Sequence, residues 1–161
     1  MIPAPFESPI YTVRPEWIDA NGHLNLAYYL VLLDWATDAL WAEIGLGDVL
    51  RATGHATFAA ESHVLYRAEL TAGETVRVQA LVLGADAKRM HIAHEMRRCE
   101  DGTLAAMQEL MYLCVDLGTR RVASFPAPIA QGLQQAVHAH AGLQRPDWIG
   151  RRIAMPSASP A

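Results

Sequence analysis

A short polar stretch carries the side chains best suited to chemistry. Residues 17–29 read Trp-Ile-Asp-Ala-Asn-Gly-His-Leu-Asn-Leu-Ala-Tyr-Tyr, so Asp19, Asn21 and His23 alternate just before a predicted helix. An ionised carboxylate can attack an acyl carbon or activate a water molecule. The unpaired N–H groups at the start of a helix suit the oxyanion that forms during such an attack. The stretch is therefore compatible with acyl-transfer chemistry centred on the carboxylate.

The same residue types also have an ordinary structural explanation. Asp, Asn and Gly before a helix are common turn and capping residues, and Asn25 stands where an N-cap is expected. Spacing alone does not decide between capping and catalysis.

The element that follows is predicted to be a long apolar helix from Leu26 to Ile44, ended by Gly45 and Gly47. Its two acidic residues lie four positions apart and share one face. They would be costly inside a membrane, so we expect a helix buried in a soluble protein.

Alternating and apolar runs predict five strands around that helix. They are Pro9–Arg14, Thr57–Ala68, Thr75–Leu83, Arg89–Arg98 and Leu104–Asp116. An α+β fold with a curved antiparallel five-stranded sheet wrapped around one helix is the economical arrangement. We expect one domain, with its core in residues 1–125. Residues 126–161 would add a short helix and a disordered tail from Met155 onward.

The segment Asp-x-Asn-x-His-x-Asn resembles the catalytic segment of acyl-carrier-protein thioesterases of the hotdog superfamily. Asp19 and Gly22 also resemble the Asp-x-x-Gly pattern of the 4-hydroxybenzoyl-CoA thioesterase type. The resemblance implies a hotdog fold with Asp19 as nucleophile or general base. Asn21 and His23, which match only the first group, would orient Asp19 or the water. The backbone N–H near Leu26 would hold the oxyanion.

A wider resemblance runs from about Thr12 to Arg152. It includes Val13-Arg14-Pro15-Glu16-Trp17, Ala36-Thr37-Asp38-Ala39-Leu40, Glu61-Ser62-His63, Gly84-Ala85-Asp86-Ala87-Lys88-Arg89 and His140-Ala141-Gly142-Leu143-Gln144-Arg145-Pro146. These segments are similar to the thioesterase domain associated with bacterial L-carnitine dehydrogenases. That group is linked to betainyl-CoA hydrolysis, which implies an acyl-CoA thioesterase acting on a small acyl-CoA. The dehydrogenase domain is absent from this sequence, so another acyl group stays open.

A quaternary ammonium substrate would bind against aromatic faces. The candidates are Trp17, Tyr28, Trp35, Trp41 and Tyr66, with negative charge from Glu61 and Asp34. The two tryptophans of the helix are better explained as core, whereas Trp17 lies two residues before Asp19.

Glu61 and His63 share one face of a strand and could meet Asp19 across a subunit interface, Glu61 in catalysis and His63 in substrate binding. An ordinary surface pair explains them equally well.

Basic residues that could hold the phosphates of CoA occur in adjacent pairs. Lys88 and Arg89 are the first choice, and Arg120 and Arg121 the second, although such pairs are more often solvated charge. CoA is expected only as part of the substrate, without a further cofactor. The histidines lack a third ligand at useful spacing, so no metal site is predicted.

Overall composition narrows the class of protein. The 161 residues carry a net charge of −4 and no basic footprint, which argues against nucleic-acid binding. Cys99 and Cys114 with no secretory signal predict a cytoplasmic protein with free thiols. An unpaired sheet edge predicts a homodimer or a dimer of dimers.

Two rival functions remain on the same scaffold. A hotdog acyl-thioester dehydratase would carry a His-x-x-x-x-Pro-Val-x-Pro-Gly type segment, which this sequence lacks. A non-catalytic binder of acyl-CoA or another small ligand would not need the carboxylate at position 19.

Overall fold

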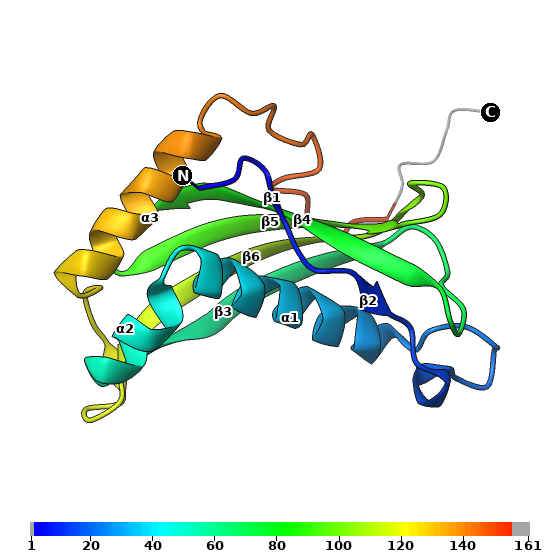
Figure 1. The fold of residues 1–161 in the computed structure, drawn as a ribbon, viewed down its shortest axis with the longest axis horizontal. Helices are drawn as coiled ribbons and strands as arrows, with labels where there is room; N and C mark the ends of the chain where they lie inside the picture. The colour runs from blue at the N-terminus through cyan, green and yellow to red at the C-terminus, as the bar shows by residue number, and fades with distance from the viewer. Residues whose placement is uncertain (1, 156–161) are drawn as a thin grey trace.

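The computed structural model describes residues 2–155, and a curved antiparallel sheet with one long helix across its inner face dominates it (Figure 1). The four long strands are β3 (His55–Tyr66), β4 (Thr75–Ala85), β5 (Arg89–Arg98) and β6 (Leu104–Asp116). Along the sheet the order is β1-β4-β5-β6-β3, so β6 is an interior strand and β3 lies at an edge. This arrangement confirms the predicted α+β fold.

The predicted first strand, Pro9–Arg14, is wrong in its bounds. Two short strands occupy this region, β1 (Phe6–Glu7) and β2 (Tyr11–Thr12), and both pair with β4. Pro9 has no N–H to donate, so the ladder breaks there. Ser8 bridges the break, because its N–H donates to Val78 O at 2.9 Å and its hydroxyl accepts from Val78 N at 3.0 Å.

The long helix α1 (Leu26–Glu43) begins and ends close to the predicted residues. Asn25 caps it, with its side-chain oxygen accepting from Ala27 N at 3.0 Å. Gly45 ends it in a left-handed conformation, φ 69°, that glycine adopts without strain. The buried residues recur at three- and four-residue spacing: Tyr29, Leu32, Leu33, Ala36, Thr37, Leu40 and Trp41. Neither α1 nor any other helix within residues 2–155 has the length and hydropathy to cross a bilayer.

Three further elements complete the fold. The sequence predicted α3 (Ala127–His140) but not the helix α2 (Leu46–Ala52) or the short strand β7 (Arg121–Val122), which pairs with β6 and makes the sheet seven-stranded. Helix α3 packs against α2 and β4, closing one end of the core. Of the predicted disordered tail, only Met155 lies within the described residues.

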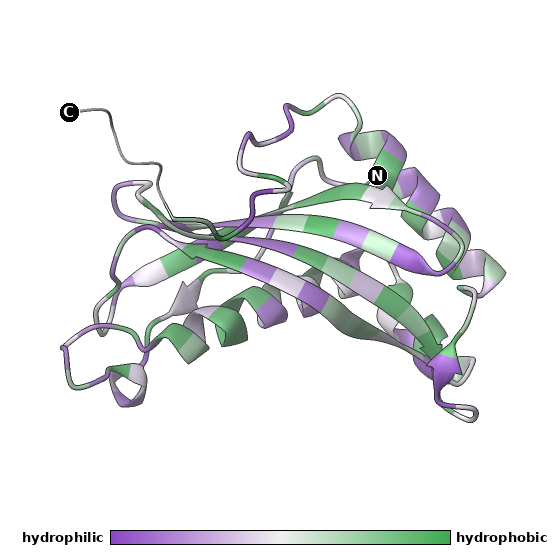
Figure 2. Ribbon diagram, turned by 180° about the vertical axis from the view of Figure 1, so that it is seen from behind, coloured by the Kyte–Doolittle hydropathy of each residue, from purple (hydrophilic) through white to green (hydrophobic). Residues whose placement is uncertain are grey.

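The two faces of the sheet differ in chemistry. Alternate residues of β4, such as Val76 and Val78, are fully buried under α1, while Arg77 and Gln79 point to the outer face. Seen from behind, the strands show hydrophilic bands among the apolar ones (Figure 2). The outer face is therefore free to carry polar contacts of its own.

The buried imidazole of His140, in α3, joins the N-terminal segment to the sheet. His140 Nδ1 accepts from the Val82 N–H at 3.0 Å, next to a register shift in β4. Its Nε2 lies 2.9 Å from Pro3 O and donates to it in the tautomer that this pair of contacts requires. The imidazole satisfies a backbone N–H that the irregular strand pairing leaves without a partner.

Candidate active site

The loop that carries Asp19 is a tight hairpin rather than a loose turn. The Asp19 N–H donates to His23 O and the Gly22 N–H to Asp19 O, each at 3.0 Å. Ile18 and Leu24 form an isolated antiparallel bridge across its base. Gly22 has φ 84°, which favours glycine at this position.

The hairpin is fixed to the rest of the fold at its base. The Leu24 N–H donates to Leu70 O at 2.7 Å, and the Asn25 N–H donates to Trp17 O at 3.0 Å. Leu24 itself is buried. Asn25 then caps α1, so the loop is held rigidly against the start of the helix.

The carboxylate of Asp19 is accessible and only partly engaged. Its Oδ1 accepts from the Asn21 backbone N–H at 2.7 Å, and His23 Nδ1 lies 3.9 Å from the same oxygen. Its side chain keeps 23% of its surface exposed. Within residues 2–155 no group donates a hydrogen bond to Oδ2. One carboxylate oxygen is therefore oriented by the loop while the other is free to act on a ligand.

The structure brings Asn21 and His23 to Asp19 in different ways. Asn21 contributes its backbone N–H, and its exposed side chain makes no hydrogen bond to a described residue. The His23 imidazole is near enough to interact with the carboxylate, although its Nδ1 also lies 3.4 Å from Leu24 O. The sequence predicted that Asp19, Asn21 and His23 lie together, and they do; their individual roles stay predictions.

The first turn of α1 offers an unbonded donor beside this loop. The Leu26 N–H has no acceptor among the described residues, and the Leu26 side chain is 63% exposed. Tyr66, from the end of β3, reaches over this turn with its hydroxyl 3.4 Å from Leu26 O. Its ring also packs edge-on against Tyr29 at 5.3 Å. Tyr66 therefore covers the first turn of α1 next to the Asp19 loop.

Trp17 does not offer the open aromatic face that a cation cage needs. The residue is 6% exposed. Tyr28 stacks on its ring at 5.1 Å, and the Arg14 guanidinium lies 4.9 Å from the ring centroid. Its neighbour Trp35 contacts it edge-on at 5.8 Å. This geometry argues against direct contact between Trp17 and an acyl group, and gives it the role of supporting the loop.

Glu61 and His63 do share one face of β3, as predicted, but it is the outer face. Their cross-strand partners in β6 are Met111 and Glu109, whereas Ser62 faces the helix side with its neighbour Leu110. A single protomer does not bring either side chain to Asp19. Their predicted contact across a subunit interface stays a prediction.

The predicted phosphate-binding residues lie at the far end of the sheet. Lys88 and Arg89 connect β4 to β5, and Arg120 and Arg121 follow β6, whereas Asp19 lies beside the opposite strand ends (Figure 1). Arg89 is already engaged, because it pairs with Asp86 at 2.6 Å. Its hydrogen bond lowers the pKa of Asp86 to about 2. Arg120 lies 5.9 Å from the ring of Phe58.

A cavity of about 370 Å³ lies between α1 and the edge of the sheet, and the sequence did not indicate it as a whole. Its lining residues are Leu30, Val31, Asp34, Ala59, Ser62, Gln108, Leu110 and Tyr112. Burial, and then the charge of Asp38, raises the pKa of Asp34. Gln108 donates to Ser62 Oγ at 3.0 Å and contacts His94 at 3.1 Å. Ser62 and Gln108 belong to no recognisable motif, and only the alternation of their strands could have indicated that they face the helix side.

No group of three or more His, Cys, Asp or Glu side chains is placed to share a metal ion within residues 2–155. The groups that the structure places together at the loop are the Asp19 carboxylate, the His23 imidazole and backbone amides.

Comparison with known proteins identifies the family. Residues 13–133 match the model of the thioesterase-like superfamily. A betainyl-CoA thioesterase of Pseudomonas aeruginosa is 40% identical over 152 residues, which span 94% of each chain. An L-carnitine dehydrogenase/betainyl-CoA thioesterase of Agrobacterium fabrum is 36% identical, and the match spans 88% of this chain and 29% of that protein.

Solved structures agree with this assignment. A Pseudomonas putida structure described as a putative thioesterase has a TM-score of 0.81 at 35% identity, over 95% of this chain and 98% of that one. A Staphylococcus aureus protein solved in complex with CoA has a TM-score of 0.86 at 27% identity, over 97% and 98%. The chain is therefore a hotdog-fold thioester hydrolase, a member of the thioesterase-like superfamily.

Proposed function

We propose that the protein hydrolyses a small acyl-CoA with a cationic acyl group, betainyl-CoA above all, and that Asp19 is the catalytic carboxylate. The observation that carries this proposal is the free Oδ2 of Asp19 beside the unbonded N–H at the start of α1. The Pseudomonas aeruginosa relative named betainyl-CoA thioesterase supports the acyl group.

The residues of the loop have distinct parts in the proposed reaction. Asp19 attacks the thioester carbon, the C–S bond breaks and CoA leaves as its thiolate, and water then opens the resulting anhydride to the free acid. Alternatively, Asp19 removes a proton from a water that attacks the same carbon, and the CoA thiolate leaves and takes up a proton. In both routes the Leu26 N–H and the helix start stabilise the oxyanion. His23 and the backbone of Asn21 hold the carboxylate in position.

The acyl group would occupy the cavity beside α1. Tyr28 and Tyr66 border the helix start, and Asp34 supplies negative charge within the cavity. A quaternary ammonium group gains from both an aromatic face and a carboxylate. Glu61 and His63 lie on the other face of the same strand, so we propose that they reach the substrate only through a second copy.

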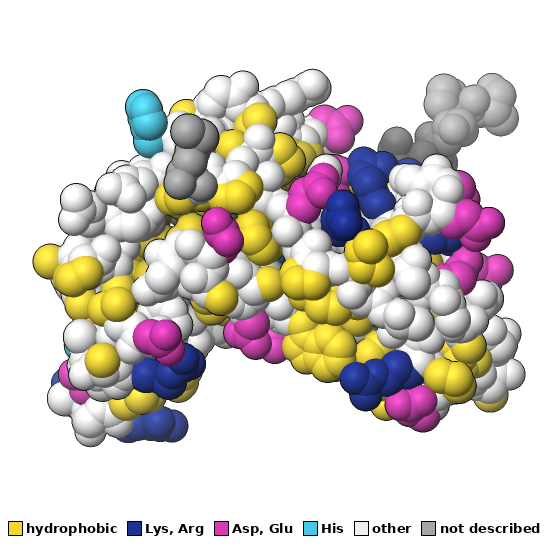
Figure 3. Space-filling view, in the orientation of Figure 1, with side chains coloured by type: hydrophobic (Ala, Val, Ile, Leu, Met, Phe, Trp, Pro, Cys, Tyr) yellow, Lys and Arg dark blue, Asp and Glu magenta, His cyan; other side chains and the backbone are white. Residues whose placement is uncertain are grey.

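We propose a homodimer or a dimer of dimers, formed through the edge of β3. This strand pairs only with β6 within residues 2–155, and it exposes Phe58 and Tyr66. Hydrophobic side chains also gather on the surface over the middle of α1 (Figure 3). An open strand edge next to exposed apolar groups favours pairing with another chain.

Antiparallel pairing of two β3 strands would also complete the site. The start of β3 in one copy would lie beside the end of β3 in the other, because the strands run in opposite directions. The basic end with Lys88, Arg89, Arg120 and Arg121 would then approach the Asp19 end of the second copy. We propose that these residues meet the phosphates of CoA there. Both cysteines are free, which supports a cytoplasmic protein.

The test is thiol release from a panel of acyl-CoAs that includes betainyl-CoA. Asp19→Asn should lower the rate by about 1000-fold or more while the fold is kept, since it removes the reacting carboxylate. Asp48→Asn, on the exposed surface of α2, is the matched control and should leave the rate unchanged. Full activity of Asp19→Asn would exclude the mechanism. Binding without thiol release, or a change in enoyl absorbance, would favour the binder or the dehydratase.

A further inference from the structure

The largest cavity among those described lies on the outer face of the sheet, away from α1, with a volume of about 700 Å³. Its floor consists of outward-facing residues of β4, β5 and β6, and its roof is the C-terminal segment (residues 141–151). That volume falls within the range of small-molecule sites, about 300–1,000 Å³. The acyl-transfer chemistry described above uses none of its lining residues.

The C-terminal segment is fixed over the sheet by two acceptors from the strands. The Trp148 indole N–H donates to Glu95 Oε1 at 3.2 Å, and the Gly150 N–H donates to Glu109 Oε2 at 2.7 Å. Glu95 also pairs with Arg97 at 2.8 Å. These contacts hold the roof in place, and the pair with Arg97 offsets the charge of Glu95, which leaves Asp147 as the second acid of the lining.

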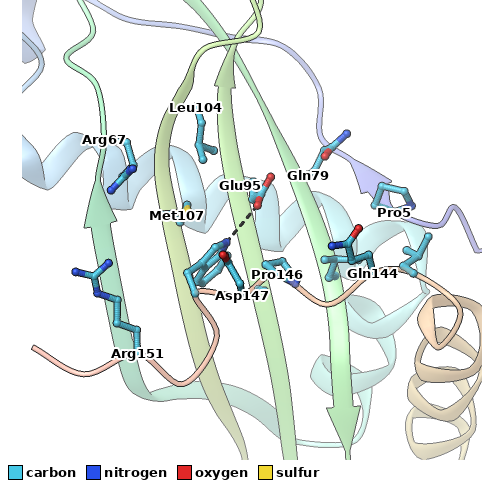
Figure 4. Close-up of a pocket in the computed structure, with 14 residues that line it drawn as sticks. Pro5, Arg67, Gln79, Glu95, Leu104, Met107, Gln144, Pro146, Asp147 and Arg151 are labelled. Atoms are coloured by element: carbon cyan, nitrogen blue, oxygen red, sulfur yellow. Dashed lines mark hydrogen bonds between the residues drawn. The ribbon is translucent and has the colours of Figure 1, made fainter.

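One side of the cavity carries two uncommitted guanidinium groups. Arg67 and Arg151 lie on the same side of the close-up, over β3 and β6 (Figure 4). Neither forms a salt bridge with another residue in the range 2–155, in contrast to Arg89 and Arg97. Two free guanidinium groups on one wall are the geometry that grips phosphate oxygens.

The rest of the lining suits the body of a nucleoside. Gln79 and Gln144 lie together on the side opposite the arginines (Figure 4), where their amides can both donate and accept hydrogen bonds. Between the two sides lie Met107 and Pro146 together with two carboxylates, Glu95 and Asp147 (Figure 4), which can accept from the hydroxyl and amino groups of a nucleoside. A planar, heteroatom-rich ring that bears a phosphate would match the arginine side, the glutamine side and the lining between them.

We propose that this outer-face cavity binds a phosphorylated nucleoside, with Arg67 and Arg151 on its phosphate and the two glutamines on its base. The nucleoside could arrive as the adenosine end of a CoA molecule or as a free nucleotide, and these share the same recognition chemistry. The site is separate from the basic end of the sheet that holds Lys88 and Arg89, so a CoA molecule bound here would place its 3′-phosphate at the arginines of the cavity and leave only its diphosphate for that basic end.

The first test is calorimetric titration of the full-length protein with adenosine 3′,5′-bisphosphate, and with adenosine as the probe that lacks phosphate. The bisphosphate should bind saturably and adenosine should bind at least about tenfold more weakly, because adenosine lacks the charge-assisted hydrogen bonds between phosphate and guanidinium. Arg67→Ala and Arg151→Ala should each weaken binding by about tenfold. Arg145→Ala removes a charge from the same segment without touching this cavity, and should change binding less than about twofold.

Three results would overturn the proposal: no saturable binding, equal affinity in the two arginine variants, or an equal loss in Arg145→Ala. Arg67→Gln repeats the test with a polar side chain, in case Arg67→Ala disturbs the exposed strand end. Binding in Asp19→Asn should be unchanged, so failure of thioester hydrolysis and failure of this site give different results.

Kinetics distinguish the two sources of the nucleoside. If it is part of CoA, Arg67→Ala raises the KM for acyl-CoA about tenfold but not the KM for an acyl-pantetheine, which lacks the nucleotide, and CoA competes with the probe. If the nucleotide is free, the KM stays unchanged and CoA does not displace the probe. Both patterns require loss of probe binding in Arg67→Ala.

Discussion

Two histidines of β5, three residues apart, show how differently the two faces of one sheet treat the same side chain. His94 faces the helix, is fully buried, and burial lowers its pKa to about 4. His91 faces outward, keeps 25% of its side chain exposed, and pairs with Glu109 at 2.7 Å. Burial on the inner face favours the neutral form of His94, whereas on the outer face the partner of His91, Glu109, also holds the C-terminal segment through Gly150.

The largest expected effect on stability comes from shortening a fully buried side chain of α1, which leaves an empty space in the core. Leu33→Ala on α1, where the side chain is fully buried, should lower the free energy of unfolding by about 2–5 kcal/mol. Leu30→Ala, on the same helix but 38% exposed, should cost clearly less. Urea denaturation measures both. Equal losses would mean that α1 is not packed against the sheet on the face described.

A pH-dependent effect should follow from the buried imidazole. His94 has a pKa of about 4 in the folded chain and an ordinary value of 6.5. Between these values the unfolded chain binds a proton that the folded chain excludes. The free energy of unfolding therefore falls as the pH drops from 6.5 to 4, by up to about 3 kcal/mol.

His94→Gln should remove this part of the pH dependence, because glutamine keeps a hydrogen-bonding side chain but does not titrate. The measurement is the urea midpoint of both proteins at pH 7.5 and pH 4.5. If the two proteins lose stability in parallel, His94 is not the group responsible.

The smallest effect is expected at the contact that holds the C-terminal segment. Glu109→Gln keeps the shape of the side chain but removes its charge and one of its two acceptor oxygens. It should cost about 1 kcal/mol locally, seen as roughly fivefold faster amide exchange at Gly150. Glu100→Gln, on an exposed turn, should leave that exchange unchanged. A large loss of global stability in Glu109→Gln would instead mean that the C-terminal segment unfolds together with the core of the protein.

Much of the fold was predictable because local signals agreed with tertiary packing. Asn25 and Gly45 marked the ends of α1, and alternation in β4 and β5 identified the buried faces. The loop with Asp19 could also be found, since its residue types are unusual together. Each of these signals depends only on residues that are close together in the sequence.

The features that the sequence did not predict depend on contacts between residues that are far apart in the sequence. Helix α2 has only 7 residues and is stabilised by packing against α3, which no local pattern encodes. Trp17 looked available from its position beside Asp19, but Tyr28 and Arg14 cover its ring. Arg67 and Arg151 lie 84 positions apart in the sequence, and only the path of the C-terminal segment brings them to one cavity.

The imidazole that joins Pro3 and Val82 has a consequence for how the chain is made. His140 lies 58 positions after Val82 and 137 positions after Pro3, so this junction cannot form until residue 140 has left the ribosome. The strands and α1 can assemble earlier through closer contacts. The contact to Pro3 is therefore among the last to form, and a nascent chain stalled before position 140 would hold its N-terminal segment only through the pairing of β1 and β2 with β4.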